Sequence, residues 1–265
     1  MVDIHCHILP DVDDGPKRIE GSLSMLRNAS KAGVKIVVAT PHLLEGTFEI
    51  KVAERDCLIH ELQEKANGNG INVQIKAGYE YYISPKMSDQ KYSLAEFTIN
   101  NNGRYILLEL PMHSIPIYVE NVLVNLTDRG ITPIIAHPER NMIISKNPNV
   151  LLNFVSKGCV AQLNAGSILG YYGKSVRETA RILLQHNLVH LVASDMHSPK
   201  SLPMPKALPA VEAQIGLDKA SYMFNVVPYR IVMGEDFDKD EPLSYEPKRR
   251  GLKDILFRKK KKTQK

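Results

Sequence analysis

The chain opens with Met1-Val2-Asp3-Ile4-His5-Cys6-His7, a short apolar segment that carries two histidines. Its composition is typical of a buried β-strand, and side chains alternate between the two faces of a strand. His5 and His7 therefore point to the same side, where two imidazoles form a rigid pair of ligands for a divalent metal ion. A pair of buried, hydrogen-bonded histidines has the same spacing, so the rest of the chain must decide between the two interpretations.

Segments rich in Val and Ile alternate with helical patterns along most of the chain, which is typical of βα units and a parallel sheet. We expect seven strands, at 2–6, 35–40, 72–78, 104–110, 132–136, 160–164 and 189–194. We expect helices between them, at 21–32, 49–66, 117–128, 148–156, 175–186 and 203–214. With 265 residues, of which 43% are hydrophobic, the chain has the usual size of a one-domain α/β barrel, here with fewer than eight units.

Residues of metal-ligand type stand at the C-terminal end of six of the seven expected strands, and the remaining strand ends in Asn164. They are His5, His7, His42, Glu80, Glu109, His137, Asp195 and His197. In a parallel barrel these strand ends meet on one face, where active sites are built. Any one of these residues alone would more often be a surface or capping residue, but the whole set favours one shared metal site.

The charge is divided unevenly along the chain. The net charge is +5, and residues 248–265 contain ten Lys or Arg and one Asp, which leaves −4 for residues 1–247. We therefore divide the chain into a barrel domain, 1–247, and a basic C-terminal tail, 248–265. A mildly acidic body lacks the basic surface that nucleic acid requires, so we expect no nucleic-acid partner.

Two interpretations of the tail stay open. Leu252, Ile255, Leu256 and Phe257 fall on one side of a short helix, next to four consecutive lysines. The tail is either a solubilising disordered end or a weak contact with an anionic membrane surface. The chain has no apolar run long enough to span a membrane. We also expect no signal peptide, because the histidine pair comes within the first seven residues. We expect a cytoplasmic protein, membrane-proximal if the tail binds lipid.

The cysteines exclude one class of phosphatase. Cys6, Cys57 and Cys159 are too scattered for a disulfide framework. Cysteine-based phosphatases have an arginine six positions after the nucleophile, but those positions are Val12, Gln63 and Ala165 here. No thiol mechanism is expected.

With these residues in view, the chain resembles the polymerase-and-histidinol-phosphatase (PHP) superfamily, and within it the manganese-dependent tyrosine-protein phosphatases of bacterial capsule and exopolysaccharide operons. The metal motifs are Asp3-Ile4-His5-Cys6-His7, Ala39-Thr40-Pro41-His42, Gly78-Tyr79-Glu80, Leu108-Glu109, Ala136-His137 and Ser194-Asp195-Met196-His197. Two further motifs, Asp13-Asp14-Gly15-Pro16 and His137-Pro138-Glu139-Arg140, narrow the resemblance to the phosphatase branch.

The resemblance implies a distorted (β/α)7 barrel that holds three divalent ions. It assigns the first ion to His5, His7, Glu109 and Asp195. The second falls to Glu80, Glu109 and His137, with Glu109 bridging, and the third to Asp14, His42 and His197. Arg140 is implied to contact the substrate phosphate, and tyrosine-phosphorylated proteins, especially a bacterial tyrosine kinase, are the implied partners.

The residue types agree with this chemistry. Imidazole and carboxylate ligands without thiolate suit Mn, Fe or Zn, and we expect Mn²⁺. Bound metals lower the pKa of water from about 15.7 towards 7, so we predict direct attack by a metal-bridging hydroxide, without a phosphoenzyme. We expect the Arg140 guanidinium to donate hydrogen bonds to two phosphate oxygens. His197 is a candidate proton donor.

Other functions remain as alternatives. Histidinol phosphate or another small phosphomonoester would use the same metals, and only the two branch motifs argue against such a substrate. A catalytically silent scaffold barrel would have lost ligands, and none is missing. A nuclease would need a basic cleft, which the acidic body does not offer.

Overall fold

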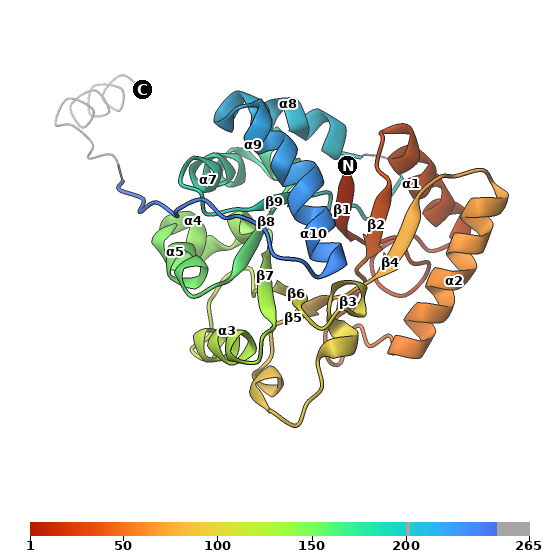
Figure 1. Cartoon of the computed structure of the whole chain (residues 1–265), viewed down its shortest axis with the longest axis horizontal. Coiled ribbons are helices and arrows are strands. Elements are labelled where there is room, and N and C mark those ends of the chain that lie inside the picture. The colour runs from red at the N-terminus through yellow and green to blue at the C-terminus, as the bar shows by residue number, and fades with distance from the viewer. Residues whose placement is uncertain (200–201, 248–265) are drawn as a thin grey trace, which may run out of the picture.

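The structure is a computed structural model, and it describes residues 1–199 and 202–247. The basic tail, 248–265, lies outside the described residues. Within them the strands are β1 (Val2–Cys6), β2 (Ile36–Ala39), β3 (His42–Leu43), β4 (Gln74–Ala77), β5 (Glu80–Tyr82), β6 (Tyr105–Glu109), β7 (Thr132–Ala136), β8 (Val160–Asn164) and β9 (Leu191–Ala193). The strands lie in the middle of the molecule and helices surround them (Figure 1). The fold is a mixed α/β domain with parallel sheets.

The strands pair in parallel in two sheets, with the orders β1-β2-β4 and β3-β5-β6-β7-β8-β9. Two short strands were not expected: β3 begins two residues after the expected strand at 35–40, and β5 begins two residues after the one at 72–78. A break separates β3 from β2 and another separates β5 from β4. Pro41 lies at the first break and has no N–H to donate. Gly78 lies at the second, where a Cβ atom would come within 2.8 Å of Val38 Cγ1.

The first and last strands lie beside each other. The Asp195 N–H donates to the His5 carbonyl (2.9 Å), and the His7 N–H donates to the Met196 carbonyl (3.0 Å). These bonds place the histidine pair at the N-terminus of the chain next to the acid and histidine that follow β9, about 190 residues later.

The main helices are α1 (Ile19–Lys31), α2 (Val52–Gly68), α3 (Val119–Asp128), α5 (Asn149–Ser156), α7 (Lys174–Gln185) and α8 (Met204–Ile215). All six were expected, and their observed bounds differ from the expected ones by at most three residues. They turn apolar faces inward; α1, for example, buries Met25, Leu26 and Ala29. In the described part of the chain, no helix has the length and apolarity needed to cross a bilayer.

Several short helices were not expected. They are α4 (Met142–Lys146), α6 (Ala165–Leu169), α9 (Leu217–Ser221), α10 (Val227–Met233), the π-helix η5 (Tyr222–Val226) and the 3₁₀ helices η1 (Pro85–Ser88), η2 (Ala95–Phe97), η3 (Ile99–Asn101) and η4 (Pro138–Arg140). The most important for the fold is α10, which lies across the strands in Figure 1.

A buried apolar cluster joins α10 to the strands. Val227, Ile231 and Val232 of the C-terminal helices pack with Val2 and Leu191, which lie at the N-terminal ends of their strands. This end of the strand layer is therefore filled with aliphatic side chains. The opposite, C-terminal ends of the strands remain available for polar residues.

Candidate metal centre

The ligand-type residues predicted from the sequence converge at the C-terminal ends of the strands. Their ligand atoms form three overlapping groups, in each of which the atoms lie within 4.8 Å of one another. The groups are His5, His7, Glu80 and Asp195; His42, Glu80 and Glu109; and His7, Asp14, His42 and His197. His137 joins the centre through Glu80, whose Oε1 lies 2.8 Å from His137 Nε2. A cavity of about 380 Å³ opens onto this centre, lined by Asp14, His42, Glu80, Glu109, His137, Arg140, Tyr172, Asp195 and His197.

A hydrogen-bond relay orients His5. Its Nδ1 lies 2.9 Å from Gln162 Oε1, while the amide nitrogen of Gln162 donates to Asn164 Oδ1 (2.9 Å). Because the Gln162 oxygen accepts, His5 Nδ1 must carry the proton. The lone pair on His5 Nε2 is then directed into the centre, as a metal ligand requires.

Asp13 orients His7 in the same way. Its Oδ2 lies 2.8 Å from His7 Nδ1 and also accepts from the His42 N–H (3.1 Å). Its Oδ1 accepts from the Gly15 N–H (2.9 Å). Gly15 is required at this position, because a Cβ atom there would lie 2.6 Å from the His7 carbonyl oxygen.

The inner group fits a cation. His5 Nε2 and His7 Nε2 lie 3.2 Å apart, and both carry lone pairs when their Nδ1 atoms donate. Glu80 Oε2 is buried 3.2 Å from each of these nitrogens and 3.0 Å from His42 Nδ1, yet none of these contacts has hydrogen-bond geometry. Lone pairs and a carboxylate oxygen directed at one point repel each other unless positive charge lies among them.

The pKa values of the centre respond to the same electrostatics. Burial opposes ionisation of Glu80, but the surrounding imidazoles, His5 first, hold its pKa well below the ordinary value. Burial also lowers the pKa of His5, but Glu80 and Asp195 outweigh it and raise that pKa to about 9. Without metal, the carboxylates thus draw protons onto the imidazoles, and bound cations would replace those protons.

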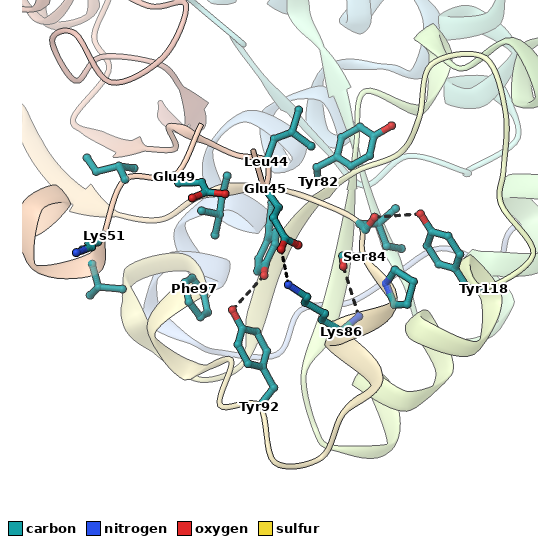
Figure 2. A pocket seen from close by; sticks show the side chains of 16 residues that line it. Leu44, Glu45, Glu49, Lys51, Tyr82, Ser84, Lys86, Tyr92, Phe97 and Tyr118 are labelled. Carbon is teal, nitrogen blue, oxygen red and sulfur yellow. Dashed lines mark hydrogen bonds and ion pairs between the residues drawn. The ribbon is translucent and has the colours of Figure 1, made fainter. Parts of the chain in front are cut away.

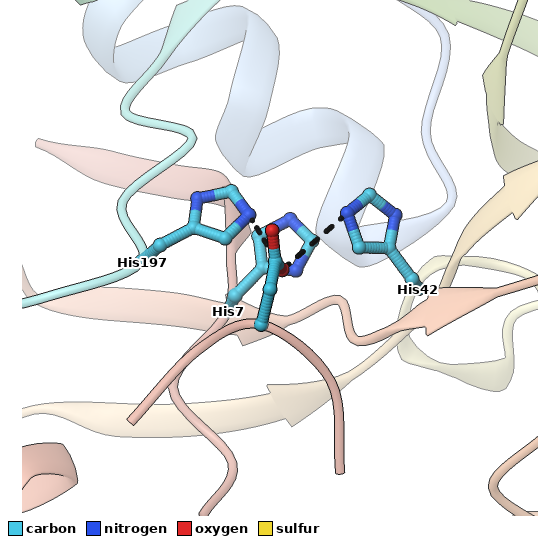
Figure 3. A group of neighbouring side chains, drawn as sticks. His7, His42 and His197 are labelled. Carbon is cyan, nitrogen blue, oxygen red and sulfur yellow. Dashed lines mark ion pairs between the residues drawn. The ribbon is translucent and has the colours of Figure 1, made fainter. Parts of the chain in front are cut away.

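Asp14 and two histidines form the outer group. Figure 3 shows His42 and His197 on either side of His7, with dashed lines for their ion pairs to Asp14. Asp14 Oδ1 lies 3.2 Å from His197 Nε2 and 3.6 Å from His42 Nε2, and the rings of His7 and His197 stack with centroids 3.8 Å apart. Burial, and then the charge of His7, lower the pKa of His197. A neutral imidazole favours the ligand role over the role of proton donor.

Arg140 leaves the short helix η4 beside the centre. Its Nη1 donates to Asp195 Oδ2 (2.9 Å), and its guanidinium carbon lies 4.6 Å from the centre of the Tyr172 ring. The guanidinium is thus held at the cavity between an acid and an aromatic face, with about a quarter of the side chain exposed. One positively charged group therefore faces the space above the ligand side chains.

Two of the ligand-type residues have unusual backbones. His137 has φ 31° and Asp195 has φ 51°, both in the left-handed region that residues other than glycine rarely occupy. His137 directly follows β7, and Asp195 lies two residues after the end of β9, so both turn the chain at the cavity. Such conformations persist where the surroundings enforce them, and they cluster at functional sites.

A family model described as capsular polysaccharide synthesis, CpsB/CapC, matches residues 1–233. The chain belongs to the CpsB/CapC family. It is 34% identical over 218 residues to the tyrosine-protein phosphatase YwqE of Bacillus subtilis, covering 82% of this chain and 85% of that protein. It is also 34% identical over 245 residues to the tyrosine-protein phosphatase CpsB of Streptococcus pneumoniae, covering 89% and 99%.

The fold is also shared with a solved CpsB/CapC-family structure. The TM-score is 0.87 at 30% identity, covering 93% of this chain and all of that one. That work describes YwqE from Bacillus subtilis and CpsB from Streptococcus pneumoniae as unique metal-dependent tyrosine phosphatases. The resemblance drawn from the sequence motifs is confirmed.

This CpsB/CapC-family protein groups its ligand-type residues differently from the expected division. His7 also belongs to the outer group, and His42 takes the place expected for His137. Glu80, and not Glu109, lies with His5, His7 and Asp195. Glu109 lies further out, with Glu80 and His42. Glu80 therefore takes the central position that was expected for Glu109, because its Oε2 lies within 3.2 Å of ring nitrogens of His5, His7 and His42.

Sequence reasoning missed the aromatic wall of the cavity. Tyr172 follows α6 and reaches Arg140 across the cavity mouth, and no periodicity or motif pointed to it. Gln162 was not predicted to have a role in the site, although it orients His5. Gln162 lies two residues before Asn164 on β8 and therefore on the same face of the strand. This spacing could have indicated that its side chain belongs to the site.

Proposed function

We propose that this CpsB/CapC-family protein is a metal-dependent protein-tyrosine phosphatase that acts on tyrosine-phosphorylated proteins in capsule or exopolysaccharide synthesis, including a bacterial tyrosine kinase. One observation carries the proposal: a single cavity joins a dense cluster of imidazoles and carboxylates to one guanidinium. The tyrosine-phosphatase relatives support it, because they align over most of their length.

We infer that the centre holds three divalent ions, with Mn²⁺ as the native metal and Fe or Zn as alternatives. His5, His7, Glu80 and Asp195 would hold one, Glu80, Glu109 and His137 another, and Asp14, His42 and His197 the third. When bound, the metals supply water with a lowered pKa and neutralise charge on the phosphate.

The residues of the chain then have separate tasks. Arg140 binds phosphate oxygens and neutralises the charge that develops on them, and Tyr172 and Asp195 fix its position. We infer that cysteine is not the nucleophile, because none of the three cysteines lines the metal-lined cavity. Cys6 and Cys159 are buried, and Cys57 is exposed on α2. Burial raises the pKa of the Cys159 thiol to about 12, which keeps it protonated. We infer that water attacks phosphorus directly, without a phosphoenzyme.

We also infer that the two sheets form one distorted (β/α)7 barrel. Counting β2 with β3 and β4 with β5 gives seven strands. The hydrogen bonds from Asp195 to His5 and from His7 to Met196 support a continuous ring. In this proposal residues 1–247 are the phosphatase domain and residues 248–265 are a separate basic tail. A cytoplasmic location near the membrane is part of the same proposal.

Phosphate release from a phosphotyrosine peptide tests the function. We expect activity to disappear after chelation and to return with added Mn²⁺ more fully than with Fe²⁺ or Zn²⁺. The variant His7→Ala should lose activity, because it removes a side chain shared by two ligand groups. His60→Ala is the matched control, since His60 is exposed on α2.

Histidinol phosphate is the substrate of the rival hypothesis and should be assayed under the same conditions. A kcat/KM that strongly favours histidinol phosphate over the phosphotyrosine peptide would refute the proposal. Full activity in the chelated protein would refute the role of the metals.

A further inference from the structure

A second cavity, of about 590 Å³, lies between the segment that follows β3 and the segment that follows β5. Figure 2 shows Leu44 and Glu45 on one side, facing Tyr92 and Lys86 on the other. The volume is larger than that of the metal-lined cavity and within the range of ligand-binding pockets.

The walls of this cavity are mainly apolar. Leu44, Ile50 and Val52 contribute aliphatic surface, and Tyr81, Tyr92 and Tyr118 contribute rings. Three of the four tyrosine hydroxyls are engaged: those of Tyr81 and Tyr92 hydrogen bond to each other (3.2 Å), and that of Tyr118 donates to the Ile83 carbonyl (3.4 Å). The rings therefore offer their carbon faces to an occupant.

The charged residues of the cavity cancel. Lys86 Nζ lies 2.6 Å from Glu45 Oε1, and the remaining acid and base are Glu49 and Lys51. Lys86 and Glu45 are both largely exposed, so they belong to the rim. A charged occupant gains nothing from such a balanced rim, whereas an apolar one gains from the walls.

Residues that line this cavity neighbour residues of the metal-lined one on two strands. Leu43 and Leu44 directly follow His42, and Tyr82 follows Glu80 by two residues on β5. Tyr82 is also the register partner of Glu109 across β5 and β6. Neighbours in register lie side by side at about 4.8 Å. Tyr82 thus lines the second cavity, and its neighbour Glu109 lines the metal-lined cavity.

We propose that the second cavity is a substrate subsite that binds a large apolar or aromatic side chain next to the phosphotyrosine of the substrate protein. The inference rests on the proposed phosphatase function, because it takes the phosphotyrosine to be in the metal-lined cavity. When the phosphotyrosine of a substrate is bound in the metal-lined cavity, the residues next to it in the substrate chain must lie over the surface around that cavity. Residues two positions apart in an extended chain are separated by about 7 Å, as are Glu80 and Tyr82 along β5.

Peptides that differ only beside the phosphotyrosine test the subsite. Phenylalanine is placed in turn at each of the three positions before and after the phosphotyrosine, in a background of serine. In the wild-type protein we expect one position, within two or three residues of the phosphotyrosine, to raise kcat/KM about tenfold over the all-serine peptide.

Two variants each introduce a negative charge into the wall of the second cavity. Leu44→Glu acts from the loop after β3, and Val52→Glu acts from the first turn of α2, where an acidic residue suits the helix. Both should lower kcat/KM for the phenylalanine peptide to that of the serine peptide. Leu217→Glu is the matched control, because Leu217 is exposed on α9 and outside this cavity.

Phenyl phosphate, which has no flanking residues, separates the outcomes. Its turnover should be unchanged in both variants, which also reports an intact fold and metal centre. Equal kcat/KM for all peptides in the wild-type protein would refute the subsite. Failure of the wild-type protein to hydrolyse any phosphotyrosine peptide or phenyl phosphate would refute the phosphatase function itself.

The proposal would also be refuted if the second cavity is occupied by a second copy of the chain or by the tail. A change of oligomeric state in Leu44→Glu without a change in peptide preference would assign the cavity to a second copy of the chain. Removal of residues 248–265 that speeds turnover of all peptides equally would assign it to the tail of the protein.

Discussion

At the scale of single residues, the centre depends on the groups that lie behind its imidazoles. Asp13 and Gln162 contact the Nδ1 atoms of His7 and His5, so that both Nε2 atoms point inward. Such partners fix both the tautomer and the ring orientation of a ligand histidine. The acid behind His7 is therefore as important for the site as the ligand itself.

The variant Asp13→Asn tests this dependence. The Asp13 carboxylate accepts from His7, His42 and Gly15, and an amide cannot replace all of these acceptor positions. We expect a loss of Mn²⁺ affinity or activity of about 10- to 100-fold. Metal titration followed by phosphate release measures both quantities. Asp128→Asn, on the exposed end of α3, is the control, and an unaltered Mn²⁺ affinity in Asp13→Asn would contradict the expectation.

Tyr172 tests how Arg140 is positioned. Removal of the ring in Tyr172→Leu leaves the guanidinium held only by Asp195. A cation–π contact contributes about 0.5–2 kcal/mol, so we expect kcat/KM to fall about 3- to 30-fold, with weaker inhibition by inorganic phosphate. Tyr172→Phe keeps the ring and should retain nearly full activity. If the Leu and Phe variants behave alike, the stacking has no role.

At the scale of elements, the short strands β3 and β5 determine which residues lie beside the metal-lined cavity. The breaks before β3 and β5 move these short segments into the larger sheet, where His42 is the register partner of Glu80. The same shift pairs Tyr82 with Glu109.

The segment before β9 carries a buried histidine with a pH-dependent effect on stability. His190 Nδ1 accepts from the Ala161 N–H (3.1 Å), and its Nε2 has no partner in the described part of the chain. Burial, together with Lys239, lowers the pKa of His190 to about 3. Below pH about 6.5 the unfolded chain binds a proton here that the folded protein does not bind until pH about 3.

The free energy of unfolding should therefore fall as the pH decreases through this window. His190 contributes up to about 1.4 kcal/mol per pH unit. The variant His190→Asn keeps an acceptor for Ala161 but does not titrate, so its stability should fall less steeply between pH 6 and pH 4. Urea unfolding of both proteins in the presence of chelator measures the difference. Parallel pH profiles would show that His190 has no such effect.

At the scale of the whole molecule, the charges are separated into an acidic body and a basic tail. Residues 1–247 carry −4 and residues 248–265 carry +9. Each basic residue close to an anionic bilayer contributes about 1 kcal/mol of attraction, which salt weakens. We therefore predict that the tail brings the phosphatase domain to an anionic membrane surface.

Sedimentation with vesicles tests this prediction. We expect the full chain to sediment with vesicles that contain anionic lipid, and a chain that ends at residue 247 to stay in solution. Replacement of the four lysines at 259–262 by glutamine should give an intermediate result, and high salt should release the full chain. Equal sedimentation of the full and shortened chains would leave the tail without a membrane role.

Much of this protein could be predicted from its sequence by itself. All seven expected strands are present within two residues of their expected bounds, whereas the short strands β3 and β5 were not expected. The ligand-type residues were recognisable because they follow those strands, and parallel strand ends meet on one face. Local patterns carry this information, since side-chain alternation and apolar content depend on near neighbours in the chain.

Only the tertiary structure decided how those residues combine. It placed Glu80 at the centre, stacked Tyr172 on Arg140, and opened the apolar cavity beside Tyr82. These contacts join residues that are tens to almost two hundred positions apart, and their distances depend on strand breaks and loop paths that no local pattern encodes. The kinds of ligand are a property of the sequence, whereas their grouping is a property of the packed sheet.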